Sequence, residues 1–138
     1  KIFATDEMVS DFLNSDADYN ILKSNSFNDN AGHGWVQFLN RDVYFEGGME
    51  NENFKGSAPD DYERFHRFTT LGYKVDRVNN EIYHLEHERG MNCYPQSMSQ
   101  HPHWAENWAL WEHLESCDKE QLREYYSNQE YLKKYVSS

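Results

Sequence analysis

The chain is 138 residues long and carries a formal net charge of −11 at pH 7. A negative charge without any cluster of Lys and Arg argues against a nucleic-acid partner, because binding to the phosphate backbone depends on such clusters. The apolar runs are far shorter than the roughly 20 residues of a membrane-spanning helix. We therefore expect a cytoplasmic protein without a transmembrane segment here, and any membrane association would come from outside these residues.

This length suits one domain, and we predict a single domain over residues 1–138. Because the first residue is Lys1 rather than Met, we expect these residues to be an excerpt of a longer protein. Cys93 and Cys117 stand apart without a CxxC partner. Neither a disulfide framework nor a zinc knuckle is indicated.

The first 45 residues are predicted to run from a polar segment through a loop into a strand. Residues 1–30 are polar with short apolar groups, and residues 24–34, "SNSFNDNAGHG", have the composition of a loop. Residues 35–45, "WVQFLNRDVYF", are rich in β-branched and aromatic side chains and predict a strand that leads into a short helix or turn. Gly47 and Gly48 end this unit.

Residues 59–72 predict a helix. Pro59 suits the first helical position, and the acids at 60, 61 and 63 fall in the first turn, where the helix dipole favours negative charge. Gly72 supplies a stop in the left-handed conformation. One apolar face is expected from side chains at three-residue steps: Tyr62, Phe65, Phe68 and Leu71.

The remainder is predicted as two short strands and a helical tail. The strands are residues 73–78 and 81–87, on either side of turn residues Asn79 and Asn80. The tail, at about 104–136, begins with an amphipathic helix whose packed face is Trp104, Trp108, Trp111 and Leu114. A further helix begins at Asp118, with Gln121 at the capping-box position.

The adjacent acids Asp60 and Asp61 are the first candidate for chemistry. Acids at a helix start usually do no more than compensate the dipole. Here a glycine-rich segment precedes them, and glycine lets a backbone pass close to a ligand. Two neighbouring acids can also have different roles: one binds a hydroxyl while the other takes its proton. We expect one of them to be a catalytic base that faces an open cleft.

His84 and His87, in "YHLEHERG", are the second candidate. Residues three apart in an extended segment point to opposite faces, so a clamp of two histidines on one metal needs a turn at this point. We expect one to ligate a metal and the other to support the pocket. A half-buried, hydrogen-bonded histidine is the alternative for each. His101 and His103 lack supporting acids or cysteines as metal ligands.

A resemblance emerges from "GWVQFLNRDVYFEGGMENENFKGSAPDDYERFHRFTTLGYKV" followed by "IYHLEHERGMN". This stretch, about residues 33–92, resembles the C-terminal segment of β-1,4-galactosyltransferases and of bacterial capsule or chondroitin-type transferases. Those enzymes show a Gly-rich strand, Asn-Arg, Gly-Gly, Asn-Glu-x-Phe, a Gly-Trp-Gly-x-Glu-Asp loop and a metal-binding histidine. "HWAENWALWEHLESCDKEQLREYY" is weakly similar to the tails of bacterial members.

The resemblance implies roles for individual residues. Asp61 falls on the aspartate that deprotonates the acceptor hydroxyl, and Asp60 on the acid that binds the acceptor sugar. His87 matches the histidine that ligates a divalent metal, usually Mn²⁺, on the UDP-sugar, and His84 matches a second ligand position. The substrate-binding residues implied around the sugar pocket are Gly47, Gly48, Glu50, Asn51 and Trp35.

The sequence departs from the family pattern at two points. Ser57 replaces the sugar-stacking Trp, and Asp60 shortens the Glu, which puts acceptor choice and activity in doubt. Such enzymes also have an N-terminal nucleotide-binding half that ends in a metal-binding Asp-x-Asp. Asp16-Ala17-Asp18 follows no hydrophobic strand, so we interpret it as a polar turn, with that motif as the alternative.

The resemblance implies an α/β fold, the C-terminal half of a GT-A type glycosyltransferase domain. The implied activity is transfer of a hexose or hexosamine from a UDP-sugar donor to a saccharide acceptor with inversion, with Asp61 as base and a divalent metal on the diphosphate. The competing hypothesis is a non-catalytic carbohydrate-binding or structural module derived from that fold. A metal-independent lectin is the third.

Overall fold

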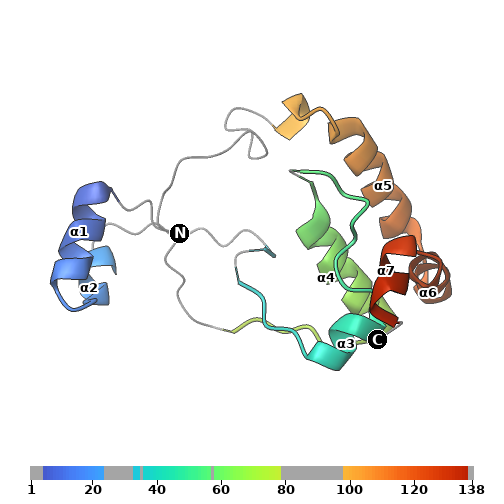
Figure 1. Cartoon of the computed structure of the whole chain (residues 1–138), viewed down its shortest axis with the longest axis horizontal. Helices are drawn as coiled ribbons and strands as arrows, with labels where there is room; N and C mark the ends of the chain where they lie inside the picture. Colours follow the sequence, from blue (N-terminus) through green and yellow to red (C-terminus); the bar gives the residue numbers. More distant parts are fainter. Residues whose placement is uncertain (1–4, 24–32, 35, 57, 79–97, 137–138) are drawn as a thin grey trace. The chain divides into compact units, whose positions relative to one another are not determined.

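The computed structural model describes residues 5–23, 33–34, 36–56, 58–78 and 98–136 (Figure 1). Within them the regular elements are helices: α1 Asp6–Asn14, α2 Tyr19–Lys23, α3 Arg41–Glu46, α4 Asp60–Leu71, the 3-10 turn η1 Met98–Gln100, α5 Trp104–Ser116, α6 Lys119–Ser127 and α7 Glu130–Val136. No strand occurs among these described residues. The α/β fold expected from the sequence is therefore wrong for this part of the chain.

The strand predictions, which relied on side-chain type alone, are wrong for the described residues. Residues 36–40 and 73–78 form no ladder, and the first of these runs leads into the short helix α3. Phe38 is 89% exposed and Val78 is 78% exposed. β-Propensity largely reflects packing against neighbouring strands, which these side chains lack. The other predicted strand, residues 81–87, lies outside the described residues.

The chain divides into two compact units, of which the first comprises Lys1–Gly32 with Val78–Glu88. In it, Thr5 caps α1 by accepting a hydrogen bond from the Met8 backbone N–H. Leu22 of α2 is buried against Met8, Val9 and Phe12.

Between α1 and α2, Asp16 and Ala17 adopt positive φ values of 59° and 62°. Asp18 accepts hydrogen bonds from the Asn20 backbone and side chain. The Asp-x-Asp sequence is therefore a turn, as predicted.

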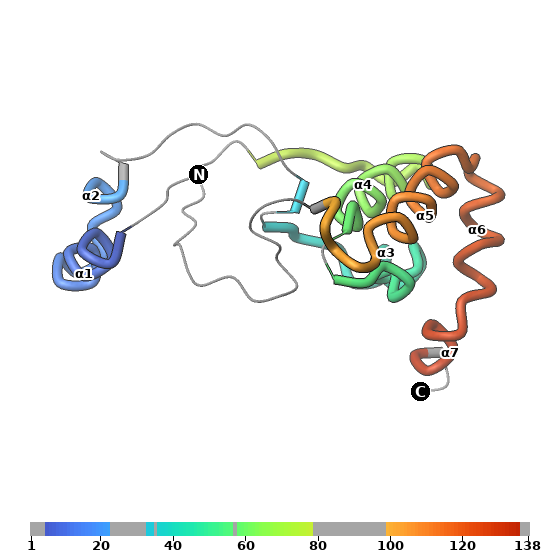
Figure 2. The backbone as a smooth tube through the Cα atoms, turned by 90° about the horizontal axis from the view of Figure 1, so that it is seen from above, coloured from blue at the N-terminus to red at the C-terminus, as the bar shows by residue number. Residues whose placement is uncertain are grey.

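The second unit comprises His33–Arg77 with Arg89–Ser138. Helix α4 packs against α5 and α6 (Figure 2), and Leu114, Leu122 and Tyr126 form the buried cluster. The predicted helix ends are confirmed: Gly72 is left-handed at φ 95°, and Asp118 with Gln121 forms a capping box. None of the helices among the described residues is long and apolar enough to cross a bilayer.

The faces that α4 and α5 bury agree only in part with those predicted: Phe68 and Leu114 are buried as expected. The buried side chains of α4 are Glu63, Arg67 and Phe68, while Tyr62 is 50% exposed. In α5 the buried residues are Asn107 and Leu114, and Trp108 stacks on Trp104 at the surface with 38% exposure. Helical spacing located both helices. It could not show that an ion pair and an amide would displace aromatic rings from the interior.

Candidate functional site

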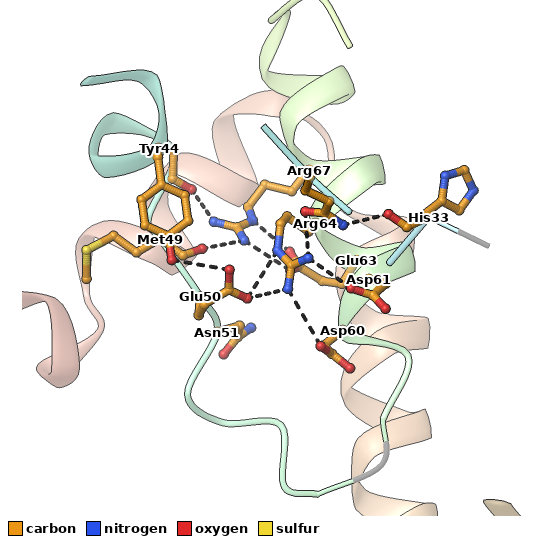
Figure 3. A network of polar contacts seen from close by, with 12 residues as sticks. His33, Tyr44, Met49, Glu50, Asn51, Asp60, Asp61, Glu63, Arg64 and Arg67 are labelled. Carbon is orange, nitrogen blue, oxygen red and sulfur yellow. Dashed lines mark hydrogen bonds and ion pairs between the residues drawn. The ribbon is translucent and has the colours of Figure 1, made fainter. Parts of the chain in front are cut away.

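A buried ion pair joins α4 to the segment that follows α3. Arg67 is 0% exposed and Glu63 is 1% exposed. The Arg67 guanidinium donates to the carbonyl oxygens of Gly47 and Met49, the second at 2.7 Å (Figure 3). Its Nε lies 2.9 Å from Glu63 Oε1, in ion-pair rather than hydrogen-bond geometry. One arginine therefore fixes the backbone of residues 47–49 against α4.

Tyr126 of α6 completes this network. Its hydroxyl donates to Glu63 Oε1 at 2.6 Å and accepts from Asn51 Nδ2 at 3.0 Å. Burial, with the nearby Glu63 carboxylate, raises the pKa of Tyr126, so the hydroxyl stays protonated and remains a donor. The Arg67 guanidinium also lies 4.2 Å from the centre of the Tyr126 ring, a cation–π contact.

Three residues expected around the sugar pocket lie in this packed region. A Cβ on Gly47 would lie 2.4 Å from the Phe68 ring, and a Cβ on Gly48, whose φ is 89°, would lie 2.4 Å from the Tyr126 ring. Asn51 is buried and bonded to Tyr126. The double glycine thus permits close packing of the backbone against two aromatic rings.

Glu50 and the acid pair meet at Arg64, one turn into α4. Arg64 donates to both Glu50 and Asp61, with Nη1 at 2.9 Å from Asp61 Oδ1. Asp60 Oδ2 lies 3.6 Å from Arg64 Nη2. The arginine side chain is only 11% exposed, whereas each of the three carboxylates is 40–49% exposed. A single cation therefore holds three half-exposed acids in one group.

His33 and Gly34 lie against the first turns of α4, and Gln37 binds the same arginine. Gln37 donates from Nε2 to the His33 carbonyl at 2.6 Å, and its Oε1 accepts from Arg64 Nη1 at 2.7 Å. Arg64, Gln37 and Gly34 were not predicted from the sequence as members of this group. The role of Arg64 could have been predicted, because an arginine three and four residues after two acids is placed to pair with both on a helix. No comparable sequence pattern indicated roles for Gln37 and Gly34.

The predicted helix-start position of Asp61 is confirmed, and two surface hollows among the described residues lie away from its side chain. One, about 150 Å³, is lined by Gly47, Gly48 and side chains of α3, α4 and α6. The other, about 290 Å³, is lined by Tyr44, Phe45, Met49, Glu50, Glu52 and Tyr135. Asp61 lines neither, and its carboxylate lies between Arg64 and the Gly34 backbone.

Burial raises the pKa of Asp60, with a further contribution from the Asp61 carboxylate. A raised native pKa means that ionised Asp60 destabilises the fold above that pKa, and the penalty vanishes below the unfolded value of about 3.9. We expect Asp60→Asn to raise the melting temperature at pH 7 and to lose this advantage as the pH falls towards 4. Melting curves from pH 3.5 to 8 measure the difference in melting temperature between Asp60→Asn and the wild type, with Asp76→Asn at an exposed position as control. An equal gain for Asp60→Asn at every pH would contradict the assignment.

The described residues contain no group of three or more His, Cys, Asp or Glu side chains arranged to hold a metal ion. The residues predicted to bind metal, His84 and His87, lie outside the described residues, as does Trp35. His101 is buried beside Gly56, where an added Cβ would lie 2.2 Å from His101 Nε2. His103 pairs with Glu106 at 3.1 Å.

Comparisons with protein-family models, with curated proteins and with solved structures found no match to this chain. The galactosyltransferase resemblance therefore remains a prediction from the sequence.

Proposed function

We propose that this chain forms the acceptor side of an inverting, UDP-sugar-dependent glycosyltransferase. One observation carries the proposal: Arg64 gathers Glu50, Asp60 and Asp61 into one half-exposed group. These are three of the residues that the resemblance assigns to the sugar site, and Glu50 comes from a different segment. A structure that scattered them would have removed the reason to place them in one site.

In this proposal Asp61 takes the proton of an acceptor hydroxyl as the hydroxyl oxygen attacks the anomeric carbon. The new bond forms on one face of the sugar while the bond to the UDP oxygen breaks on the other, and UDP leaves with the electron pair. A base is required because a sugar hydroxyl is a poor nucleophile at neutral pH. Arg64 orients the Asp61 carboxylate, and the half-exposed Asp60 carboxylate beside it can accept a hydrogen bond from an acceptor hydroxyl.

The donor side of the proposal rests on residues that the structure does not describe. His84 and His87 are the expected ligands of Mn²⁺ or another divalent cation. The metal would neutralise charge on the departing diphosphate. The role proposed for Arg64 and the acid pair does not depend on how that metal is held.

Release of UDP tests the proposal. The full-length gene product is incubated with UDP-hexoses and UDP-hexosamines, Mn²⁺ and a panel of saccharide acceptors. We expect acceptor-dependent UDP release that EDTA abolishes and added Mn²⁺ restores. UDP release that never depends on an acceptor, or none with any donor, would refute the transferase.

A non-catalytic carbohydrate-binding or structural module is the second candidate. Two observations favour it: Asp61 is paired with an arginine, and Gly47, Gly48 and Asn51 serve internal packing. Saccharide binding in titration calorimetry, together with no turnover of any UDP-sugar, is the result that would select it.

A further inference from the structure

Gly34, from another part of the chain, lies against the Asp61 carboxylate. A Cβ built on Gly34 would lie 1.6 Å from Asp61 Oδ2, 2.2 Å from Cγ and 2.7 Å from Oδ1. Real Cβ atoms essentially never approach another heavy atom within 3.0 Å. The carboxylate therefore occupies the space that any side chain at position 34 would need.

Backbone conformation does not explain this glycine. The glycines with positive φ among the described residues are Gly48, Gly56 and Gly72, and Gly34 is not one of them. Its φ lies outside the left-handed range that favours glycine, and the three heavy atoms nearest to an added Cβ all belong to the Asp61 carboxyl group.

The segment that carries Gly34 is held on α4 by contacts on both sides of it. The His33 ring stacks on Phe65 with centroids 4.2 Å apart and meets the Tyr62 ring edge-on at 5.2 Å. Gln37 bonds to the His33 carbonyl and to Arg64 Nη1, the nitrogen that also bonds to Asp61. Gly34 is thus pressed against a carboxylate whose cation helps to hold the same segment.

We infer that Gly34 is a positioning residue for Asp61. Its backbone closes one side of the space in which the carboxylate lies, and Arg64 closes another. A methyl group at position 34 would displace the short Asp61 side chain before it moved the backbone, and the contact with Arg64 would be lost. The consequence for turnover rests on the proposed function, whereas the coupling between Gly34 and Asp61 does not.

A double-mutant cycle on stability tests the coupling without any assay of activity. Gly34→Ala should lower the melting temperature by about 2–6 °C in the wild-type background. In the Asp61→Ala background, Gly34→Ala should leave the melting temperature unchanged or raise it. The carboxylate is then absent, and alanine reduces the freedom of the unfolded chain. Phe38→Ala, at an 89% exposed position of the same segment, is the control and should show no coupling.

The same effect of Gly34→Ala in both backgrounds, whether a loss or none, would overturn the inference. Gly34→Ala alone could fail to fold. In that case, folding of the Gly34→Ala/Asp61→Ala double variant would demonstrate the coupling, and a double variant that also fails to fold would contradict it.

The turnover number is a second measurement. Substitution of a glycine that is needed only for stability would leave kcat of the folded enzyme unchanged. Gly34→Ala should lower kcat by about 10²-fold, the effect of a misplaced catalytic group, with little change in KM for the donor. Added to Asp61→Asn it should lower kcat no further, because the two residues act as a unit. A further loss on the Asp61→Asn background would count against positioning. If the wild type has no turnover, the proposed function fails and the stability cycle still decides the role of Gly34.

Discussion

Replacing Arg67 with methionine should destabilise the protein by about 3–5 kcal/mol. The substitution leaves the Glu63 carboxylate, 1% exposed, without its cation. It also removes the hydrogen-bond donors of the Gly47 and Met49 carbonyl oxygens. Each buried polar group left without a partner costs about 1–3 kcal/mol.

Urea unfolding followed by circular dichroism measures this loss. Arg123→Met is the matched control, because Arg123 pairs with Glu120 at 3.0 Å where both side chains are more than half exposed. Such a pair is worth about 0–1 kcal/mol. Burial raises the pKa of Glu63, so the deficit of Arg67→Met should shrink as the pH falls and the carboxyl is protonated. A loss no larger than that of Arg123→Met would show that the buried pair is dispensable.

Asp61→Asn should lower turnover of the proposed transferase by about 10²–10⁴-fold, the usual contribution of a general base. Asparagine keeps the shape of the side chain and can accept a hydrogen bond from Arg64, but it cannot take the acceptor proton. The affinity for the UDP-sugar should stay nearly intact, because the donor is expected to bind elsewhere. Initial rates of UDP release at varied donor and acceptor concentrations separate the two effects.

Asp76→Asn serves as the control, since Asp76 is exposed and pairs with Lys74 outside the acid group. Asp60→Asn should act mainly on KM for the acceptor. If Asp60→Asn instead removes turnover while Asp61→Asn retains it, Asp60 is the base and Asp61 only anchors Arg64. Full turnover in both variants would place the base outside this pair.

Helices α4, α5 and α6 were predictable because their signals are local, whereas α1 and α2 lie in residues that were not predicted as helical. Pro59 and the first-turn acids indicated the start of α4, Gly72 indicated its end, and Asp118 with Gln121 fixed the start of α6. Each signal depends on groups within a few residues of one another, so a single sequence contains all of it.

The buried faces and the contacts of the acid group were not predictable in this way. Glu63 and Arg67, four residues apart, have the spacing of an ordinary surface pair. Their burial depends on the carbonyl oxygens of Gly47 and Met49 and on the hydroxyl of Tyr126. The need for glycine at position 34 likewise depends on where Asp61 lies. Both features arise from tertiary contacts between segments that are distant in the sequence, and residue spacing along the chain does not reveal such contacts.

The hydrogen bonds of the Tyr126 hydroxyl bear on where the chain can be shortened. A fragment that ended after α5 would retain Glu50, Asp60, Asp61 and Arg64, but Glu63 would lose a donor that lies 63 residues further along the sequence. Asn51 would lose its acceptors on α6 as well. The minimal fragment in which the acid group keeps its native support therefore extends at least through Tyr126, well beyond the last acid that takes part in it.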